Sequence, residues 1–119
     1  MSTIFIVDDS DTNLATAEEA LEDYYNVMTM PSAAKMFELL EKISPNLILL
    51  DIEMPEMNGF EALEKLKNNA DWAKMPVIFL TGTVDPAIEK KGLSMGAVDI
   101  ISKPFSIPVL LEKIKAQVK

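Results

Sequence analysis

The sequence has 119 residues, 49% of them apolar and 25% charged, which predicts one globular domain over residues 1–119. Nineteen acidic residues against eleven lysines give a net charge of −8, so direct binding to nucleic acid or to an anionic membrane surface is not expected. The chain has no cysteine and no histidine, which excludes disulfides, thiolate nucleophiles, imidazole metal ligands and Ser-His triads. Covalent chemistry must therefore use a carboxylate, a hydroxyl or a lysine.

No apolar run is long enough to span a membrane, and the N-terminus carries no signal-peptide pattern, so a cytoplasmic location is expected. Five short β-branched or apolar runs alternate with segments of helical period. Runs that are apolar on both faces are typical of parallel strands covered by helices on each side. The expected strands are Ile4–Val7, Tyr25–Thr29, Leu47–Leu50, Val77–Leu80 and Val98–Ile101.

Five helices are expected, one after each strand, because capping residues precede apolar residues at helical spacing. The expected starts are Ser10 or Asp11, Ser32, Gly59, Asp85-Pro86 and Ser106. The expected apolar stripes include Leu14, Ala17, Leu21 and Tyr24 in the first helix, Met36, Phe37, Leu40 and Ile43 in the second, Phe60, Leu63 and Leu66 in the third, and Val109, Leu110, Leu111, Ile114 and Val118 in the fifth. Five βα units are too few to close an eight-stranded barrel, which favours a doubly wound, open α/β sheet.

Side chains suited to chemistry follow four of the five expected strands. In an open α/β sheet the functional site forms beyond the carboxyl ends of the strands. These positions hold Asp8-Asp9, Asp51, Thr81 and Lys103, and two further acids, Asp11 and Glu53, lie nearby in the sequence. If the first and third strands are neighbours, several carboxylates crowd together, and hard oxygen ligands of this kind favour Mg²⁺, Mn²⁺ or Ca²⁺.

Each of these residues has an ordinary explanation when it is taken alone. Aspartate is common in turns and helix caps, an isolated threonine caps turns, and a lone lysine is usually solvated. The indication of a site comes from five suitable side chains that fall at four strand ends of one sheet.

The chain resembles the two-component response-regulator receiver domain over essentially all of its length. The resemblance is carried by four motifs in the family's order and spacing: Ile6-Val7-Asp8-Asp9-Ser10; Leu49-Leu50-Asp51-Ile52-Glu53-Met54-Pro55 with Asn58-Gly59-Phe60-Glu61; Val77-Ile78-Phe79-Leu80-Thr81-Gly82; and Gly96-Ala97-Val98-Asp99 through Lys103-Pro104-Phe105. It implies a flavodoxin-like, five-stranded parallel sheet in the order 2-1-3-4-5.

The resemblance also implies a phosphoryl switch. Asp51 would accept a phosphoryl group from a histidine of a partner protein, forming an acyl phosphate. Asp9, Asp51 and the backbone carbonyl of Glu53 would bind Mg²⁺ (Mn²⁺ as a substitute) directly, and Asp8 would act through water. Lys103 would contact one phosphoryl oxygen and Thr81 another, and the Lys103–Pro104 peptide bond would be cis.

The implied partners are a histidine kinase or histidine phosphotransfer protein and a downstream effector protein or domain. The domain would be a monomer or a phosphorylation-dependent homodimer. It would act as a switch and not as an enzyme, catalysing only its own phosphotransfer and dephosphorylation. The chain resembles either a stand-alone receiver or one domain of a longer protein, and these alternatives remain open.

Two positions depart from the family pattern. Ile100 stands where the family usually has Tyr or Phe, so propagation of the switch by rotation of an aromatic ring is not expected. Glu53 adds a carboxylate two residues after Asp51. It either alters metal affinity or the lifetime of the acyl phosphate, or it points to solvent. Thr83 is expected to line the same entrance.

Three other functions compete with the phosphorylated receiver. An Asp-nucleophile phosphohydrolase would also use Mg²⁺, but Asp51-Ile52-Glu53 matches its motif only loosely and the chain has no room for a cap domain. A flavin-phosphate module would need a loop rich in Ser, Thr and Gly where this chain has acids. A receiver fold used only for docking is disfavoured because the full set of acceptor-site residues is present.

Overall fold

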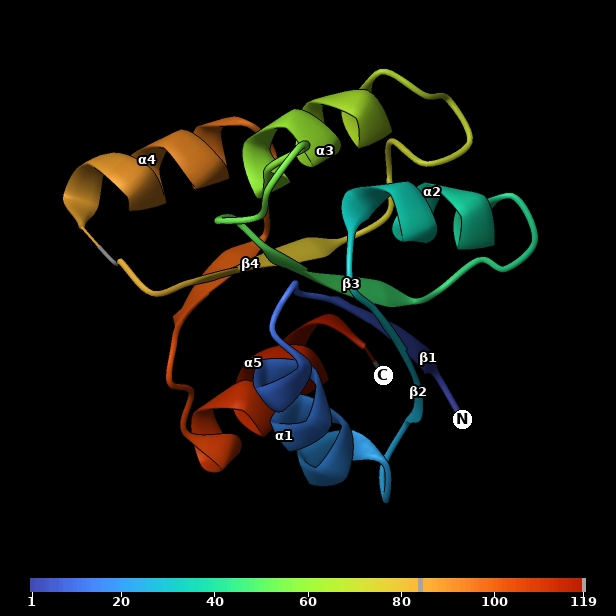
Figure 1. The fold of residues 1–119 in the computed structure, drawn as a ribbon, viewed down its shortest axis with the longest axis vertical. Helices are drawn as coiled ribbons and strands as arrows, with labels where there is room; N and C mark the ends of the chain where they lie inside the picture. Colours follow the sequence, from blue (N-terminus) through green and yellow to red (C-terminus); the bar gives the residue numbers. More distant parts are fainter. Residues whose placement is uncertain (84, 119) are drawn as a thin grey trace.

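The computed structural model, which describes residues 1–83 and 85–118, contains one parallel sheet of five strands (Figure 1). The strand order is β2-β1-β3-β4-β5, which confirms the expected topology. The strands are β1 (Thr3–Val7), β2 (Asn26–Met30), β3 (Leu47–Asp51), β4 (Val77–Thr81) and β5 (Asp99–Ser102). Each bound lies within one residue of the sequence prediction, because β-branched and apolar residues bounded by turn residues define these runs clearly.

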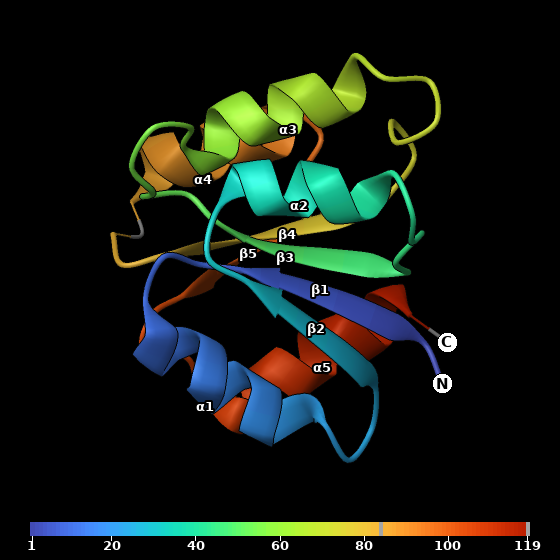
Figure 2. The ribbon, with the colours of Figure 1, turned by 45° about the vertical axis from the view of Figure 1, so that its right-hand side comes forward.

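Helices cover both faces of the sheet (Figures 1 and 2). The helices are α1 (Asp11–Leu21), α2 (Ala33–Leu40), α3 (Gly59–Lys67), α4 (Pro86–Ser94) and α5 (Ile107–Gln117). Helices α2, α3 and α4 pack on one face, and α1 and α5 pack on the other. None of the helices within the described ranges is long and apolar enough to cross a membrane.

Alternate side chains of the central strands enter two separate apolar cores. In β1, Phe5 belongs to the core beneath α2 and α3, whereas Ile4 belongs to the core beneath α1 and α5. All residues of β3 and β4 are buried. The two-sided burial explains why these strands are apolar without alternation, and it leaves only the strand ends for polar side chains.

Most helix starts agree with the capping residues seen in the sequence. Ser10, Ser32 and Asp85 each accept a hydrogen bond from the backbone N–H three residues later. The cap of α3 is Asn58, which forms a reciprocal capping box with Glu61, whereas the sequence analysis recognised only the glycine that follows it. The expected cap at Ser106 is wrong in part, since its side chain makes no capping hydrogen bond.

Two residues assigned to apolar stripes are exposed. Helix α1 ends at Leu21, so Tyr24 lies in the following turn and is 52% exposed, with the Lys115 ammonium 5.6 Å from its ring centroid. Val109 is 41% exposed, while its neighbour Leu110 is fully buried. Successive helical residues differ by about 100°, so the wide stripe read from α5 included one residue that faces outward.

The start of α3 packs directly on the backbone at the end of β3. A Cβ atom at Gly59 would lie 2.5 Å from the carbonyl oxygen of Asp51 and 2.8 Å from the Cα of Ile52. The Gly59 N–H donates to the carbonyl oxygen of Ile52 over 2.9 Å. Glycine is therefore required by close backbone approach at this point, and the contact fixes the loop that follows Asp51.

Candidate functional site

The sheet brings four of the predicted site residues to one edge. Asp8 directly follows β1 and Asp51 ends β3, and the parallel register of these neighbouring strands sets the two side by side. Thr81 ends β4, and Lys103 follows β5. The Lys103 N–H donates to the carbonyl oxygen of Thr81 over 2.8 Å, and the Lys103–Pro104 bond is cis as expected.

Asp51 is fully buried, and its two carboxylate oxygens have different surroundings. Oδ1 accepts a hydrogen bond from Lys103 Nζ at 2.9 Å and another from the Glu53 N–H at 3.2 Å. Oδ2 has no hydrogen-bond partner among the described residues. A buried carboxylate oxygen without a donor is costly, so this atom is suited to a cation or to covalent modification.

Burial raises the pKa of Asp51 from 3.8 to about 7. The hydrogen bond from Lys103 opposes this rise, whereas the negative charge of Asp8 adds to it. For Lys103, burial alone would lower the pKa, but the hydrogen bonds and charges of Asp51 and Asp8 together outweigh burial and raise it. One lysine therefore does not fully compensate for the desolvated negative charge at this edge.

Three carboxylates form a group that could hold a metal ion. One oxygen from each of Asp8, Asp9 and Asp51 lies within 4.8 Å of the others. Asp8 and Asp51 are buried and Asp9 is exposed. Among the described residues the Lys103 ammonium alone forms ion pairs with this group, so three carboxylates keep excess negative charge, and their hard oxygen atoms suit Mg²⁺ or Mn²⁺. Asp11 is an exposed first-turn residue of α1 and does not belong to this group.

Asp8 accepts hydrogen bonds from three donors, two at the start of α1 and one after β5. Its Oδ1 accepts from the Ser10 N–H at 2.9 Å, and its Oδ2 accepts from Asn13 Nδ2 at 3.3 Å and from Lys103 Nζ at 3.4 Å. Asn13 was not among the predicted site residues. Its position five residues after Asp8, in the first turn of the helix that follows, was the available signal.

Glu53 bridges the loops that follow β3 and β4. Its Oε1 accepts a hydrogen bond from Thr81 Oγ1 at 2.7 Å and another from the Gly82 N–H at 3.1 Å. Of the two alternatives for this side chain, a position directed only to solvent is therefore wrong. Thr83, expected at the entrance, contacts the same hydroxyl through its backbone: its N–H donates to Thr81 Oγ1 over 3.1 Å.

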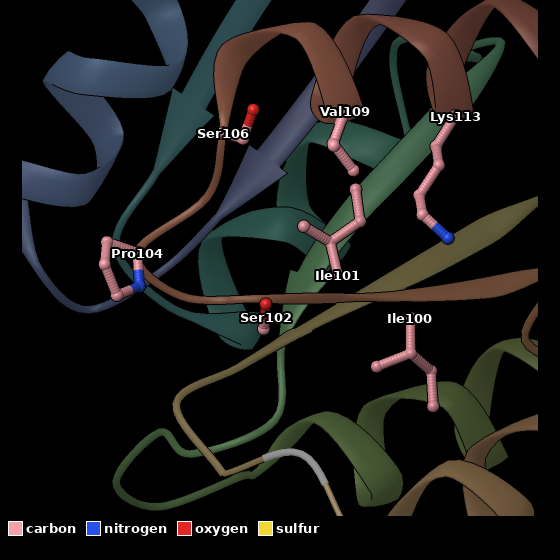
Figure 3. Close-up of a pocket in the computed structure, with 7 residues that line it drawn as sticks. All are labelled: Ile100, Ile101, Ser102, Pro104, Ser106, Val109 and Lys113. Atoms are coloured by element: carbon pink, nitrogen blue, oxygen red, sulfur yellow. The ribbon is translucent and has the colours of Figure 1, made fainter.

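Ile100 is buried beneath α4 at the position where an aromatic residue was expected from the family. A Cβ atom at Gly92 of α4 would lie 3.1 Å from Ile100 Cδ1, so the helix packs tightly on this side chain. Figure 3 shows Ile100 and Ile101 on opposite sides of β5, with Ile101 directed to α5 along a pocket that Val109 and Lys113 also line. Ile100 is thus a core residue without a ring that could swing.

Comparison with known proteins agrees with this geometry. The model of the family described as "Response regulator receiver domain" matches residues 4–115. A "Probable cyclic di-GMP phosphodiesterase" of Vibrio cholerae is 43% identical over 112 residues, which are 94% of this chain and 25% of that protein. The structure of Vibrio cholerae chemotaxis protein CheY4 superposes with a TM-score of 0.93 at 26% identity, and 99% of each chain is covered.

A second similar structure is titled "BeF3 Activated DrrB Receiver Domain"; it has a TM-score of 0.86 at 28% identity and covers 98% of this chain and 96% of that one. The curated relatives are longer: this chain spans 25% of the Vibrio cholerae phosphodiesterase and 17% of RcaC from Microchaete diplosiphon. The family model covers nearly the whole chain, and the fold has the order 2-1-3-4-5. The chain belongs to the response regulator receiver domain family.

Proposed function

We propose that residues 1–119 form one phospho-acceptor signalling module in which Asp51 receives the phosphoryl group. The observation that carries this proposal is the state of the Asp51 carboxylate. It is fully buried at the carboxyl edge of the sheet, Oδ1 is bound to Lys103, and Oδ2 has no donor among the described residues. An oxygen with a free lone pair in this position is suited to attack phosphorus.

In the proposed reaction an Asp51 oxygen forms a bond to the phosphorus of a partner phosphohistidine. The P–N bond breaks, and its electron pair returns to the imidazole nitrogen of the donor. Transfer of this kind has a loose, in-line transition state, so positioning and charge neutralisation supply most of the catalysis. Lys103 would contact a phosphoryl oxygen, and the 2.9 Å distance between its ammonium and Asp51 Oδ1 supports this role.

The residues at this edge fit Mg²⁺. Asp9 and Asp51, with the backbone carbonyl of Glu53, would hold the ion directly, and Asp8 would hold it through water. Two observations on the part of the chain that the structure describes support this assignment: the carboxylates outnumber the lysine paired with them, and Asp51 Oδ2 has no hydrogen-bond partner. The bound ion would neutralise charge that develops on the phosphoryl oxygens. Mn²⁺ has the same ligand preference and would substitute.

Phosphorylation would act as a switch through the loops that follow β4 and β5. A phosphoryl group adds a charge of about −2 and three strong acceptor oxygens, which are sufficient to attract the Thr81 hydroxyl. The phosphoryl donor would be a histidine kinase or a histidine phosphotransfer protein. The phosphorylated form would bind a downstream effector protein or domain, and we expect both interactions to take place in the cytoplasm. A self-limited switch, not turnover of a free substrate, is the proposed activity. No observation favours a phosphohydrolase.

The test is incubation with acetyl phosphate and Mg²⁺, followed by intact mass and peptide mapping. The wild type is expected to gain one phosphoryl group on the peptide that contains Asp51. Asp51→Asn is expected to gain none, because the amide cannot form the acyl phosphate, and chelation of Mg²⁺ is expected to abolish the adduct. A stable adduct on another residue, or an equal adduct in Asp51→Asn, would contradict the assignment.

Magnesium is expected to stabilise the folded protein, and Asp9→Asn is expected to weaken this effect. A ligand that binds only the folded state adds about 1.4 kcal/mol at ten times its Kd and about 2.7 kcal/mol at a hundred times. Thermal unfolding should therefore shift upward with added MgCl₂ and return after chelation. The matched control is Asp11→Asn, a nearby exposed acid outside the carboxylate group. Equal magnesium shifts in all three proteins would exclude Asp9 as a ligand.

A further inference from the structure

The Glu53 carboxylate occupies the Thr81 hydroxyl, which is the donor proposed to bind a phosphoryl group on Asp51. Its Oε1 binds the Thr81 hydroxyl at 2.7 Å and the Gly82 N–H at 3.1 Å, across 28 residues of sequence. Thr81 is fully buried, so its hydroxyl requires a partner inside the protein. The alternative acceptor within reach is the Thr83 carbonyl oxygen at 3.1 Å, which is the longer of the two contacts.

A threonine hydroxyl has one hydrogen to donate. It therefore cannot form a full hydrogen bond with Glu53 and with a phosphoryl oxygen at the same time. Hydrogen bonds to an ionised carboxylate are about twice as strong as neutral ones, so the contact with Glu53 is a serious competitor. The Glu53 carboxylate and the phosphoryl group would also repel each other at the Thr81 hydroxyl, because both are negatively charged.

The position of Glu53 on the backbone links this competition to the acceptor. Its N–H donates to Asp51 Oδ1, while its side chain reaches the loop after β4. The Glu53 side chain thus extends from the phosphorylation site to the loop proposed to move. Glu53 is an exposed residue, so its side chain can rotate into solvent once the Thr81 hydroxyl has turned away from it.

We propose that Glu53 is a positioning residue that clasps Thr81 and Gly82 in the unphosphorylated protein and opposes the activated conformation. This inference rests on the proposed function, because it assumes that Thr81 turns toward a phosphoryl group on Asp51. The clasp sets a threshold: the phosphoryl group must displace Glu53 from the hydroxyl before the loop after β4 can rearrange. With Ile100 in place of a ring, this loop contact is a local control point for the switch.

The clasp predicts that removing the Glu53 side chain favours the activated state. Glu53→Ala is expected to bind beryllofluoride, a phosphoryl analogue, about tenfold more tightly than the wild type in the presence of Mg²⁺, since the net strength of one charge-assisted hydrogen bond is about 1.4 kcal/mol or more. Glu53→Gln keeps an acceptor oxygen, so its beryllofluoride affinity is expected to lie between those of the wild type and Glu53→Ala. Glu56→Gln, the matched control, removes one charge from the same loop and is expected to match the wild type.

A double-mutant cycle separates the clasp from the charge of Glu53. In the Thr81→Ala background the hydroxyl contact with Glu53 is absent and the contact with the Gly82 N–H remains, so Glu53→Ala is expected to change beryllofluoride affinity by about twofold at most. Calorimetric titration with beryllofluoride at fixed Mg²⁺ measures all four proteins. An equal effect of Glu53→Ala in both backgrounds would show that Glu53 acts only by charge and would overturn the clasp.

The Gly82 amide tests the contact without any phosphoryl chemistry. In metal-free protein its proton resonance is expected to move upfield in Glu53→Ala, because it loses a carboxylate acceptor, and to stay in place in Glu56→Gln. An unmoved Gly82 resonance overturns the clasp even if Asp51 is phosphorylated normally. If the resonance shifts in Glu53→Ala but the wild type binds no beryllofluoride, the proposed function is overturned, and with it the competition.

Discussion

Replacing Lys103 with methionine is expected to slow phosphorylation of Asp51 by acetyl phosphate about 10²–10³-fold, the usual effect of removing one preorganised electrostatic contact to a transition state. Lys103 Nζ lies 2.9 Å from Asp51 Oδ1 and 3.4 Å from Asp8 Oδ2. Its side chain is 16% exposed, so solvent screens its charge only weakly. Methionine keeps a long unbranched side chain and removes the charge. The initial rate of the mass increase at saturating Mg²⁺ measures the effect.

Two further variants separate the position of the charge from its presence. Lys103→Arg keeps a positive charge but replaces a compact ammonium by a planar fork, so partial activity is expected. Lys113→Met removes a lysine that instead pairs with Asp99 at 2.9 Å, and its rate is expected to equal that of the wild type. Rates for Lys103→Met and Lys113→Met that agree within about threefold would show that Lys103 does not stabilise the transition state.

Folding must be checked in Lys103→Met, because the substitution removes the cation beside a buried carboxylate. Breaking a buried ion pair usually costs about 3–5 kcal/mol. Here the cost is expected to be smaller, since the pKa of Asp51 is already about 7 and the carboxylate can take up a proton. A cooperative thermal transition for the variant, at the pH of the rate measurement, confirms that lost activity does not reflect an unfolded protein.

The residues at the strand ends were predictable because topology alone controls where they meet. A parallel sheet collects the carboxyl ends of its strands at one edge, so Asp8, Asp51, Thr81 and Lys103 follow from the strand bounds and the strand order. The bounds came from apolar runs. The strand order came from the resemblance to receiver domains, because periodicity predicts five βα units but does not indicate which strands are adjacent in the sheet.

The contacts made by flexible side chains were not predictable in the same way. The choice of Glu53 between solvent and Thr81 depends on the distance between two loops, which no local pattern encodes. The contact of Asn13 with Asp8 depends on how the first turn of α1 lies over β1. Tyr24 fits the helical period of α1, but the helix has already ended at Leu21. Periodicity identifies a face and does not mark where the backbone leaves the helix.

The unusual position of the Asp51 carboxylate predicts a cost to stability that depends on pH. In metal-free protein the pKa of Asp51 is about 7, against 3.8 as the ordinary value. Between these values the folded state binds the proton more tightly than the unfolded state, so the free energy of unfolding falls as pH rises and levels off above pH 7. The raised pKa of Lys103 makes the free energy of unfolding depend on pH only above the ordinary lysine range, so it does not alter the trend between pH 3.8 and about 7.

Asp51→Asn is therefore expected to stabilise the metal-free protein, with a gain that grows by about 2–3 kcal/mol between pH 5 and pH 8. The amide is neutral at every pH and does not lose a proton in the buried site. Urea unfolding with a chelator present, at several pH values, measures the difference from the wild type. Asp11→Asn, which changes an exposed acid, is expected to show no such trend. A gain independent of pH would mean that Asp51 is ionised throughout this range. The ionised Asp51 carboxylate would then destabilise the metal-free protein at every pH in this range. Binding of the proposed Mg²⁺, and not protonation, would remove that destabilisation.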